Sequence, residues 1–232
     1  MQPGPDATAA DTSRGPLRGD SRTGRAADPV TGDVLARSGA PEDAAPTRGE
    51  AAVPQGRLAR RLATVRSGLP RTLLALVAGL ALAASFPPYG LWPLSVAAVA
   101  ALSLLTRSRT VRQGAWTGFA FGLPFFCGLL SWLHVVGWDA VFGLSAIEAL
   151  FLAALGSGLA LTSRLPGWPL WAACLWVAEE WARDRLPFGG FPWGRLAFAN
   201  TSSPFTPLAA LGGAPLVTFA VALGGALVAA AA

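Results

Sequence analysis

The sequence lacks lysine, so all eighteen of its basic side chains are arginines. A mechanism that needs a lysine amine, as a base or as a nucleophile, is therefore incomplete within these 232 residues. The phosphate-binding glycine loop, which ends in a lysine, is excluded for the same reason. The Gly-x-Ser-x-Gly turn that carries the serine of many hydrolases is also missing.

Residues that bind metals are scarce. The only histidine is His134 and the only cysteines are Cys127 and Cys174, and their spacing matches no Cys/His metal motif. We therefore expect no metal site and no cofactor. Both cysteines lie in apolar runs without a neighbouring base or cation, which predicts buried packing residues rather than reactive thiolates. His134 is predicted to be a polar side chain at a membrane interface.

Aromatic residues are missing from the first third of the chain. The first 71 residues hold eleven of the eighteen arginines and eight of the thirteen acids, but no Trp, Phe or Tyr. Such a segment cannot bury enough apolar surface to offset the entropy of ordering, so residues 1–70 are predicted to form a disordered, Arg-rich cytoplasmic tail. Because acids are interspersed and no aromatics can stack on bases, no nucleic-acid partner is expected.

Charge is scarce in the rest of the chain. Residues 72–232 contain only seven arginines and five acids, far below the quarter of residues that is typical of a soluble domain. Within a lipid bilayer only helices and closed β-barrels satisfy all of their backbone hydrogen bonds. The apolar runs lack the two-residue alternation of apolar and polar side chains that barrel strands show. Residues 71–232 are therefore predicted to form an all-α polytopic transmembrane helical domain of about six spans. The expected runs are 72–86, 91–106, 113–136, 141–163, 168–182 and 207–232.

Arginine placement predicts the topology. If spans alternate, the arginines before residue 72, those of 107–112 and Arg164 fall on one side. Short basic loops stay in the cytoplasm, so we expect a multi-pass protein of the bacterial plasma membrane with a cytoplasmic N-terminus. The turn at 87–90 and the segment 183–206 then face outside. The arginines of 183–206 depart from this trend, although nearby acids offset part of their charge.

Two polar features and a stripe of glycines are predicted within the membrane runs. Glu148 falls inside the fourth run, where an ionisable group marks either function or a buried pair. Arg183 follows Glu179 by four residues and Glu180 by three, so it can pair with either on one helical face. Glycines at 114, 118 and 122 form a smooth stripe on the third run, which predicts close approach of another helix.

Three stretches together resemble a known family. They are residues 86–94 (FPPYGLWPL), residues 118–122 (GFAFG) followed by Ser131 and Trp132, and residues 178–183 (AEEWAR) followed by 190–193 (GFPW) and 207–209 (PLA). In this order they resemble the N-terminal membrane half of bacterial apolipoprotein N-acyltransferases. The resemblance covers residues 70–232 and excludes the tail.

The resemblance implies transfer of a fatty acyl chain from a phospholipid to the α-amine of diacylglyceryl-cysteine in a lipoprotein. Phospholipids and diacylated lipoproteins are then the partners. In the family a nitrilase-like domain supplies a glutamate, a lysine and a cysteine, so we assign no catalytic residue to these 232 residues and expect them to be inactive alone. The apolar end at 223–232 predicts a fragment of a longer protein. The candidate lipid-facing residues are Glu148, Glu180, Trp181, Gly190, Phe191, Pro192 and Trp193.

Two alternatives remain open from the sequence. One is a complete but non-catalytic membrane protein derived from the same family. The other is a small transporter with Glu148 on its path, although transporters usually show internal repeats and none is evident here.

Overall fold

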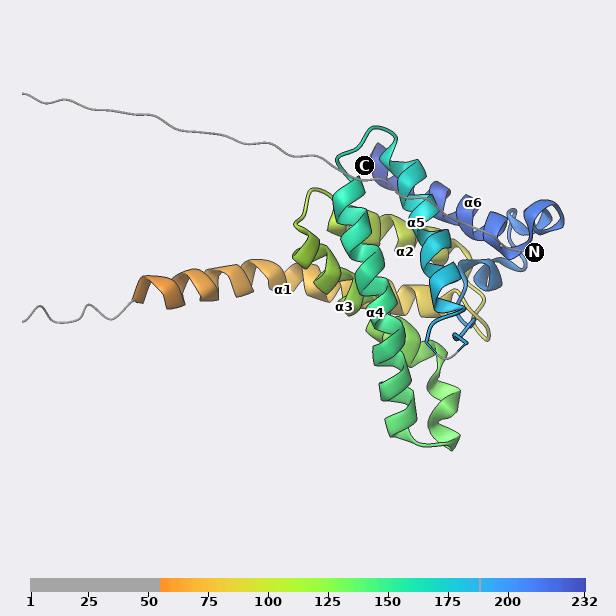
Figure 1. Ribbon diagram of the computed structural model, residues 1–232, viewed down its shortest axis with the longest axis horizontal. Coiled ribbons are helices and arrows are strands. Elements are labelled where there is room, and N and C mark those ends of the chain that lie inside the picture. Colours follow the sequence, from red (N-terminus) through yellow and green to blue (C-terminus); the bar gives the residue numbers. More distant parts are fainter. Residues whose placement is uncertain (1–54, 188) are drawn as a thin grey trace, which may run out of the picture. The chain divides into compact units, whose positions relative to one another are not determined.

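The computed structural model describes the backbone of residues 55–187 and 189–232, and side chains from residue 68 onward. All of these residues belong to one unit, Ala52–Ala232. The described part is all-helical, with six α-helices, three short 3-10 helices and no strand (Figure 1). This agrees with the predicted fold class. The predicted disorder of the tail falls mainly on residues 1–54, which lie outside the described residues.

The first two helices form a hairpin about the predicted turn at 87–90. Helix α1 (Gln55–Ala84) begins inside the segment predicted as tail, so the helical region starts before residue 71. Arg, Leu and Ala, which predominate in residues 57–64, are strong helix formers, and this explains the earlier start. The prolines at 87 and 88 stop the helix, and α2 (Pro93–Thr106) starts with a proline in its first turn.

The run predicted at 113–136 is divided in the structure. Helix α3 (Val111–Leu129) begins with a capping box in which the Thr110 hydroxyl accepts from the Gln113 N–H at 3.3 Å. It gives way to the 3-10 helix η1 (Ser131–Val135), and α4 (Trp138–Thr162) then returns antiparallel to α3. Pro124, which cannot donate to the helical ladder, lies in the last turns of α3, where this change begins.

The glycine stripe brings α3 and α4 into close contact, as the sequence predicts. A Cβ atom at Gly114 or at Gly118 would collide with the backbone of Gly156 or of Leu152 on α4. At Gly122, an added Cβ would lie only 2.9 Å from the Leu152 Cβ. Small residues thus allow the two backbones to approach closely without a loss of packing.

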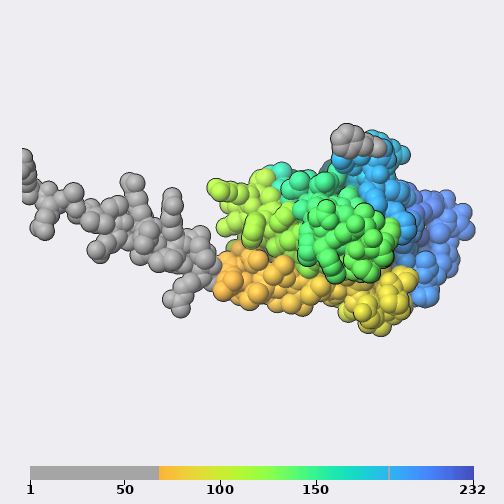
Figure 2. Space-filling view, turned by 90° about the horizontal axis from the view of Figure 1, so that it is seen from below, coloured from red at the N-terminus to blue at the C-terminus, as the bar shows by residue number. Residues whose placement is uncertain are grey.

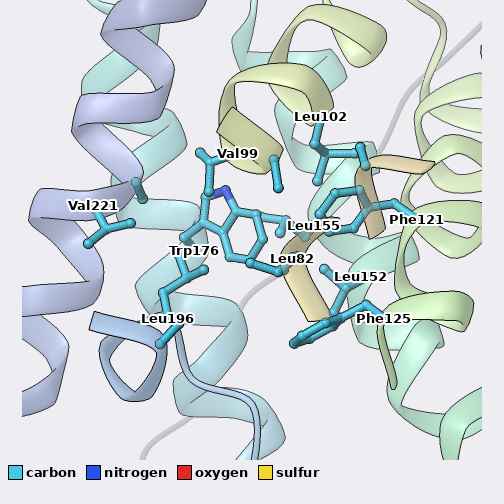
Figure 3. Close-up of a cluster of buried hydrophobic side chains, with 14 of the residues drawn as sticks. Leu82, Val99, Leu102, Phe121, Phe125, Leu152, Leu155, Trp176, Leu196 and Val221 are labelled. Carbon is cyan, nitrogen blue, oxygen red and sulfur yellow. The ribbon is translucent and has the colours of Figure 1, made fainter. Parts of the chain in front are cut away.

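The last two helices enclose an irregular segment. Helix α5 (Trp168–Arg183) is followed by a loop and the 3-10 helices η2 (Leu196–Asn200) and η3 (Thr206–Leu208). Helix α6 (Ala209–Ala231) contains a kink with non-helical backbone at Gly212 and Gly213. Trp176 of α5 lies at the centre of the core, between Leu196 and Val221 on one side and Leu82 and Leu155 on the other (Figure 3).

Two segments are long and apolar enough to cross a bilayer, judged by length and composition: α4 and Thr206–Ala231, which includes α6. The apolar parts of α1 and α2, Gly68–Ala84 and Pro93–Thr106, are shorter. Leu73, Val77 and Leu150 are among the large apolar side chains that are more than half exposed. The structure therefore contains helices suited to lipid, and the predicted number of spans stays a prediction.

Candidate functional site

A buried polar cluster lies where α4, α5 and α6 meet the segment after α5. At its centre is Arg183, which ends α5 and is 1% exposed. Its Nε donates to Glu179 Oε1 at 2.9 Å, which is the i,i+4 pair that the sequence allows. Its Nη1 donates to the carbonyl oxygen of Phe191 at 3.3 Å and also to that of Trp193. The guanidinium of Arg183 thus connects the loop that contains Phe191 and Trp193 to the end of α5 by hydrogen bonds.

Glu148 brings α4 into the same cluster. Its Oε2 lies 3.6 Å from Arg183 Nη1, and both side chains are 1% exposed. This distance is an ion pair but is too long for a hydrogen bond. The guanidinium carbon also lies 5.3 Å from the centre of the Phe126 ring on α3, a cation–π contact. Glu148 is therefore part of a buried pair, and a functional role for it stays a prediction.

Glu180 bonds to η2 and α6, whereas its neighbour Glu179 bonds to Arg183 within α5. Its Oε1 accepts from the Leu196 N–H at 2.8 Å, and its Oε2 accepts from the Thr218 hydroxyl at 2.8 Å. The first bond holds η2 and the second holds α6. Because both carboxylate oxygens are occupied and the residue is 5% exposed, Glu180 anchors the segment. It also lines a cavity of about 260 Å³ beside Trp181, and its contact with lipid stays a prediction.

Two further contacts secure the segment at its ends. Asn200 Nδ2 donates to the Leu196 carbonyl at 2.8 Å and to Ser95 Oγ at 3.1 Å, which ties η2 to the start of α2. Arg195 forms an ion pair with Asp184. Sequence reasoning missed Asn200, Ser95 and Thr218, because no local pattern links a polar residue to a partner 38 or 105 positions away.

The loop presents aromatic side chains at the surface. Gly190 has a φ of +79°, and a Cβ there would collide with the backbone of Asp184, so the turn requires glycine. The Phe191 and Trp193 rings stack with centres 6.1 Å apart, and the Trp193 ring lies 5.7 Å from that of Trp132 after α3. We call Trp132, Phe191 and Trp193 the aromatic ledge. Trp193 is 51% exposed and Trp132 is 47% exposed.

A groove runs along α5 and α6 beside the cluster. Its apolar part has a volume of about 610 Å³ and is lined by Trp181 and by Phe219 of α6, among others. It adjoins a cavity of about 260 Å³ that also contacts Trp181 and reaches Arg185. Cys174 lines the apolar part and is exposed, which corrects the expectation that both cysteines are buried.

The predicted lipid-facing residues fall into two groups. Glu148 and Glu180 are buried inside the cluster, whereas Trp181, Pro192 and Trp193 are exposed and Gly190 and Phe191 are half-buried. His134 lies apart, exposed on η1, with its Nδ1 2.7 Å from the Ser131 carbonyl oxygen. Among the described residues, no group of three or more His, Cys, Asp or Glu could hold a metal ion.

Comparisons with known proteins match this region. Residues 78–227 fit the family model of the apolipoprotein N-acyltransferase N-terminal domain. The chain is 40% identical over 148 residues to the apolipoprotein N-acyltransferase of Mycolicibacterium smegmatis, which covers 62% of this chain and 25% of that protein. It is 37% identical over 165 residues to that of Nitrosomonas europaea, which covers 65% of this chain and 32% of the relative. With the Pseudomonas putida protein the identity is 34% over 179 residues.

These relatives are much longer than the matched region. The chain spans a quarter to about a third of the length of the curated relatives it matches. The matched residues include α2 to α5, most of α6 and the whole buried cluster.

Proposed function

Because the chain belongs to the apolipoprotein N-acyltransferase family, we propose that it forms the membrane part of an enzyme that acylates lipoproteins. The reaction would transfer a fatty acyl chain from a phospholipid to the α-amine of diacylglyceryl-cysteine. In this proposal the 232 residues hold and orient lipid substrates, and the reacting groups lie elsewhere in the enzyme.

The fixed position of the aromatic ledge is the observation that carries this role. Arg183 fastens the carbonyl groups of Phe191 and Trp193, and Glu180 anchors the following Leu196, so the ledge is held rigidly. Exposed tryptophans with an apolar ring and a polar N–H favour the boundary between lipid and water. The ledge would therefore contact the lipid substrates at the outer face, beneath the domain that performs the chemistry.

The groove along α5 and α6 supports a lipid-facing role for Trp181. Its apolar part has no charged lining residue, which suits an acyl chain. It also offers no base to Cys174, so we assign no catalytic role to that thiol. The transporter alternative finds no support in the described contacts of Glu148, whose carboxylate faces the guanidinium of Arg183 at 3.6 Å.

A cluster of arginines at one end of the helices supports a cytoplasmic N-terminus. Ser108 and Ser163 are joined by a hydrogen bond of 3.1 Å, so the loop before α3 meets the loop after α4 at one end. Five arginines lie at that end, which we call the arginine end: Arg71, Arg107, Arg109, Arg112 and Arg164. Basic loops stay in the cytoplasm. The ledge would then face outside, in a multi-pass protein of the plasma membrane.

A chimera tests the proposed function. Residues 78–227 would replace the matching stretch of the Mycolicibacterium smegmatis relative, in cells depleted of their own N-acyltransferase. The mass of the N-terminal peptide of one lipoprotein then reports its acylation. We expect the triacylated form to return. A chimera that reaches the membrane in normal amount but leaves the lipoprotein diacylated would contradict the proposal.

The unfused chain tests where the chemistry lies. Expressed alone in the same cells, the 232 residues should leave only the diacylated peptide. Recovery of the triacylated peptide would mean that an unassigned nucleophile lies within these helices, and the division of roles proposed here would be wrong.

A further inference from the structure

The arginine end has no described carboxylate to balance it. The carboxylates of the described residues are Asp139, Glu148, Glu179, Glu180 and Asp184. The last four lie in or beside the buried cluster, and Asp139 lies in the first turn of α4, at the opposite end of that helix from Arg164. Among the residues whose side chains are described, the arginine end is therefore positively charged, which favours the binding of anions.

One cavity at this end brings two of the arginines together. It has a volume of about 490 Å³ and is lined by residues from the start of the apolar part of α1 and the start of α3. These two segments, orange and yellow-green, are neighbours in Figure 2. Arg71 comes from α1 and Arg112 from α3, and none of the lining residues carries a carboxylate. The Trp116 Nε1 donates to Thr72 Oγ1 at 3.2 Å, which joins the two walls.

The lining combines positive charge with exposed apolar surface. Leu69 is 57% exposed and Trp116 is 58% exposed, and both line the cavity beside the guanidinium groups. A guanidinium offers several N–H donors that match the oxygens of a phosphodiester. An exposed tryptophan and leucine at the same place suit the glycerol and the first methylenes of a lipid. The ligand that fits both features is amphiphilic and anionic.

We propose that this cavity binds the headgroup of an anionic phospholipid of the cytoplasmic leaflet, with the phosphate between Arg71 and Arg112 and the acyl chains running beside Trp116. A zwitterionic headgroup fits less well, because its ammonium group finds no carboxylate among the lining residues. The site lies at the end of the helices away from the ledge and the groove. The proposed lipid site assumes that the protein lies in a bilayer, but it does not depend on acyl transfer.

Lipid binding to the full 232-residue chain tests this site. The chain would be purified in a neutral detergent and titrated with phosphatidylglycerol or with phosphatidylcholine of identical acyl chains, and native mass spectrometry would count the bound lipids. Phosphatidylglycerol should be preferred. Each arginine near an anionic lipid raises the binding affinity about fivefold. The affinity of the Arg71→Gln/Arg112→Gln variant for phosphatidylglycerol should therefore fall on the order of 25-fold. Its affinity for phosphatidylcholine should change little.

A matched control removes the same charge from the same end. The Arg107→Gln/Arg164→Gln variant alters two arginines that do not line this cavity, and it should keep most of the affinity. An equal loss in both variants would overturn the proposal in favour of diffuse attraction. Full displacement of the lipid by millimolar inorganic phosphate would also overturn it, because the site would then take a free anion.

A single change guards against misfolding of the double variant. Arg112 is exposed in the first turn of α3, so Arg112→Gln should leave the fold intact. It should lower the affinity for phosphatidylglycerol about fivefold. No change in this variant, with its melting temperature unaltered, would count against the site. The acylation of lipoproteins by the chimera is a separate measurement, so failure of one proposal is distinguishable from failure of the other.

Discussion

Arg183 Nη1 lies 3.6 Å from Glu148 Oε2, and this buried ion pair joins α5 to α4. The pair explains why Arg183 can lie in a segment that the placement of the other arginines predicts to face outside. Arg183 is not a free charge of the loop after α5, because Glu179 and Glu148 surround it. Arg195 is likewise paired with Asp184. Of the three arginines that opposed the predicted topology, only Arg185 is exposed, and its guanidinium lies over the Trp181 ring at 4.4 Å.

Replacement of Arg183 should destabilise the protein strongly. The change Arg183→Met leaves two buried carboxylates without their cation, and breaking a buried pair in this way costs about 3–5 kcal/mol. Thermal unfolding in detergent measures the loss. The matched control is Arg185→Met, two residues away but exposed, which should change little. Similar melting temperatures for the two variants would contradict the role given to Arg183.

Loss of the Thr218 hydroxyl should weaken the attachment of α6. The change Thr218→Val keeps the shape of the side chain but leaves Glu180 Oε2 without its donor. An unsatisfied buried acceptor costs about 1–3 kcal/mol. The control is Thr162→Val, because that hydroxyl bonds only within its own helix. If both changes lower the free energy of unfolding equally, the hydrogen bond between Thr218 and Glu180 does not stabilise the fold, and the prediction is wrong.

The crossing of α3 and α4 should not tolerate a larger residue at Gly118. An alanine there would meet the backbone of Leu152, and overpacking of this kind costs about 1–3 kcal/mol. Gly143→Ala on α4 is the control, since a Cβ at that position has no atom within 4 Å. Alanine is the better helix former, so this control should be neutral or slightly stabilising. Unfolding of both variants in detergent separates a steric effect from a change in helix propensity.

The aromatic ledge should matter for acylation more than for folding. In the chimera, Trp193→Ala removes a half-exposed ring that the proposal places against lipid. Its packing on Phe191 and Trp132 contributes only about 0.5–1.5 kcal/mol per contact to folding. We expect triacylation to become about tenfold slower at a normal protein level. The control is Trp171→Ala, a half-exposed tryptophan near the start of α5. An unchanged rate for Trp193→Ala would remove the ledge from the proposed lipid contacts.

Local features of the chain were predictable because their physical causes are local. A long run of apolar residues forms a helix wherever backbone groups must be satisfied internally, and prolines end it. The glycine stripe predicted a close helix contact, and Gly114, Gly118 and Gly122 make that contact with α4. The pair between Glu179 and Arg183 followed from a spacing of four residues on one helix.

The sequence by itself determined most of the helices, the glycine stripe on α3 and the spacing of Glu179 and Arg183, because each depends on residues within a few turns of one another. Only the tertiary structure decided the partners of the buried polar groups. Glu148 finds Arg183, and Glu180 bonds Leu196 and Thr218, because folding brings distant elements together. A buried carboxylate requires some partner, but its choice depends on packing geometry that no local pattern encodes. That geometry places Glu148 and Glu180 inside the polar cluster that holds the loop of the aromatic ledge.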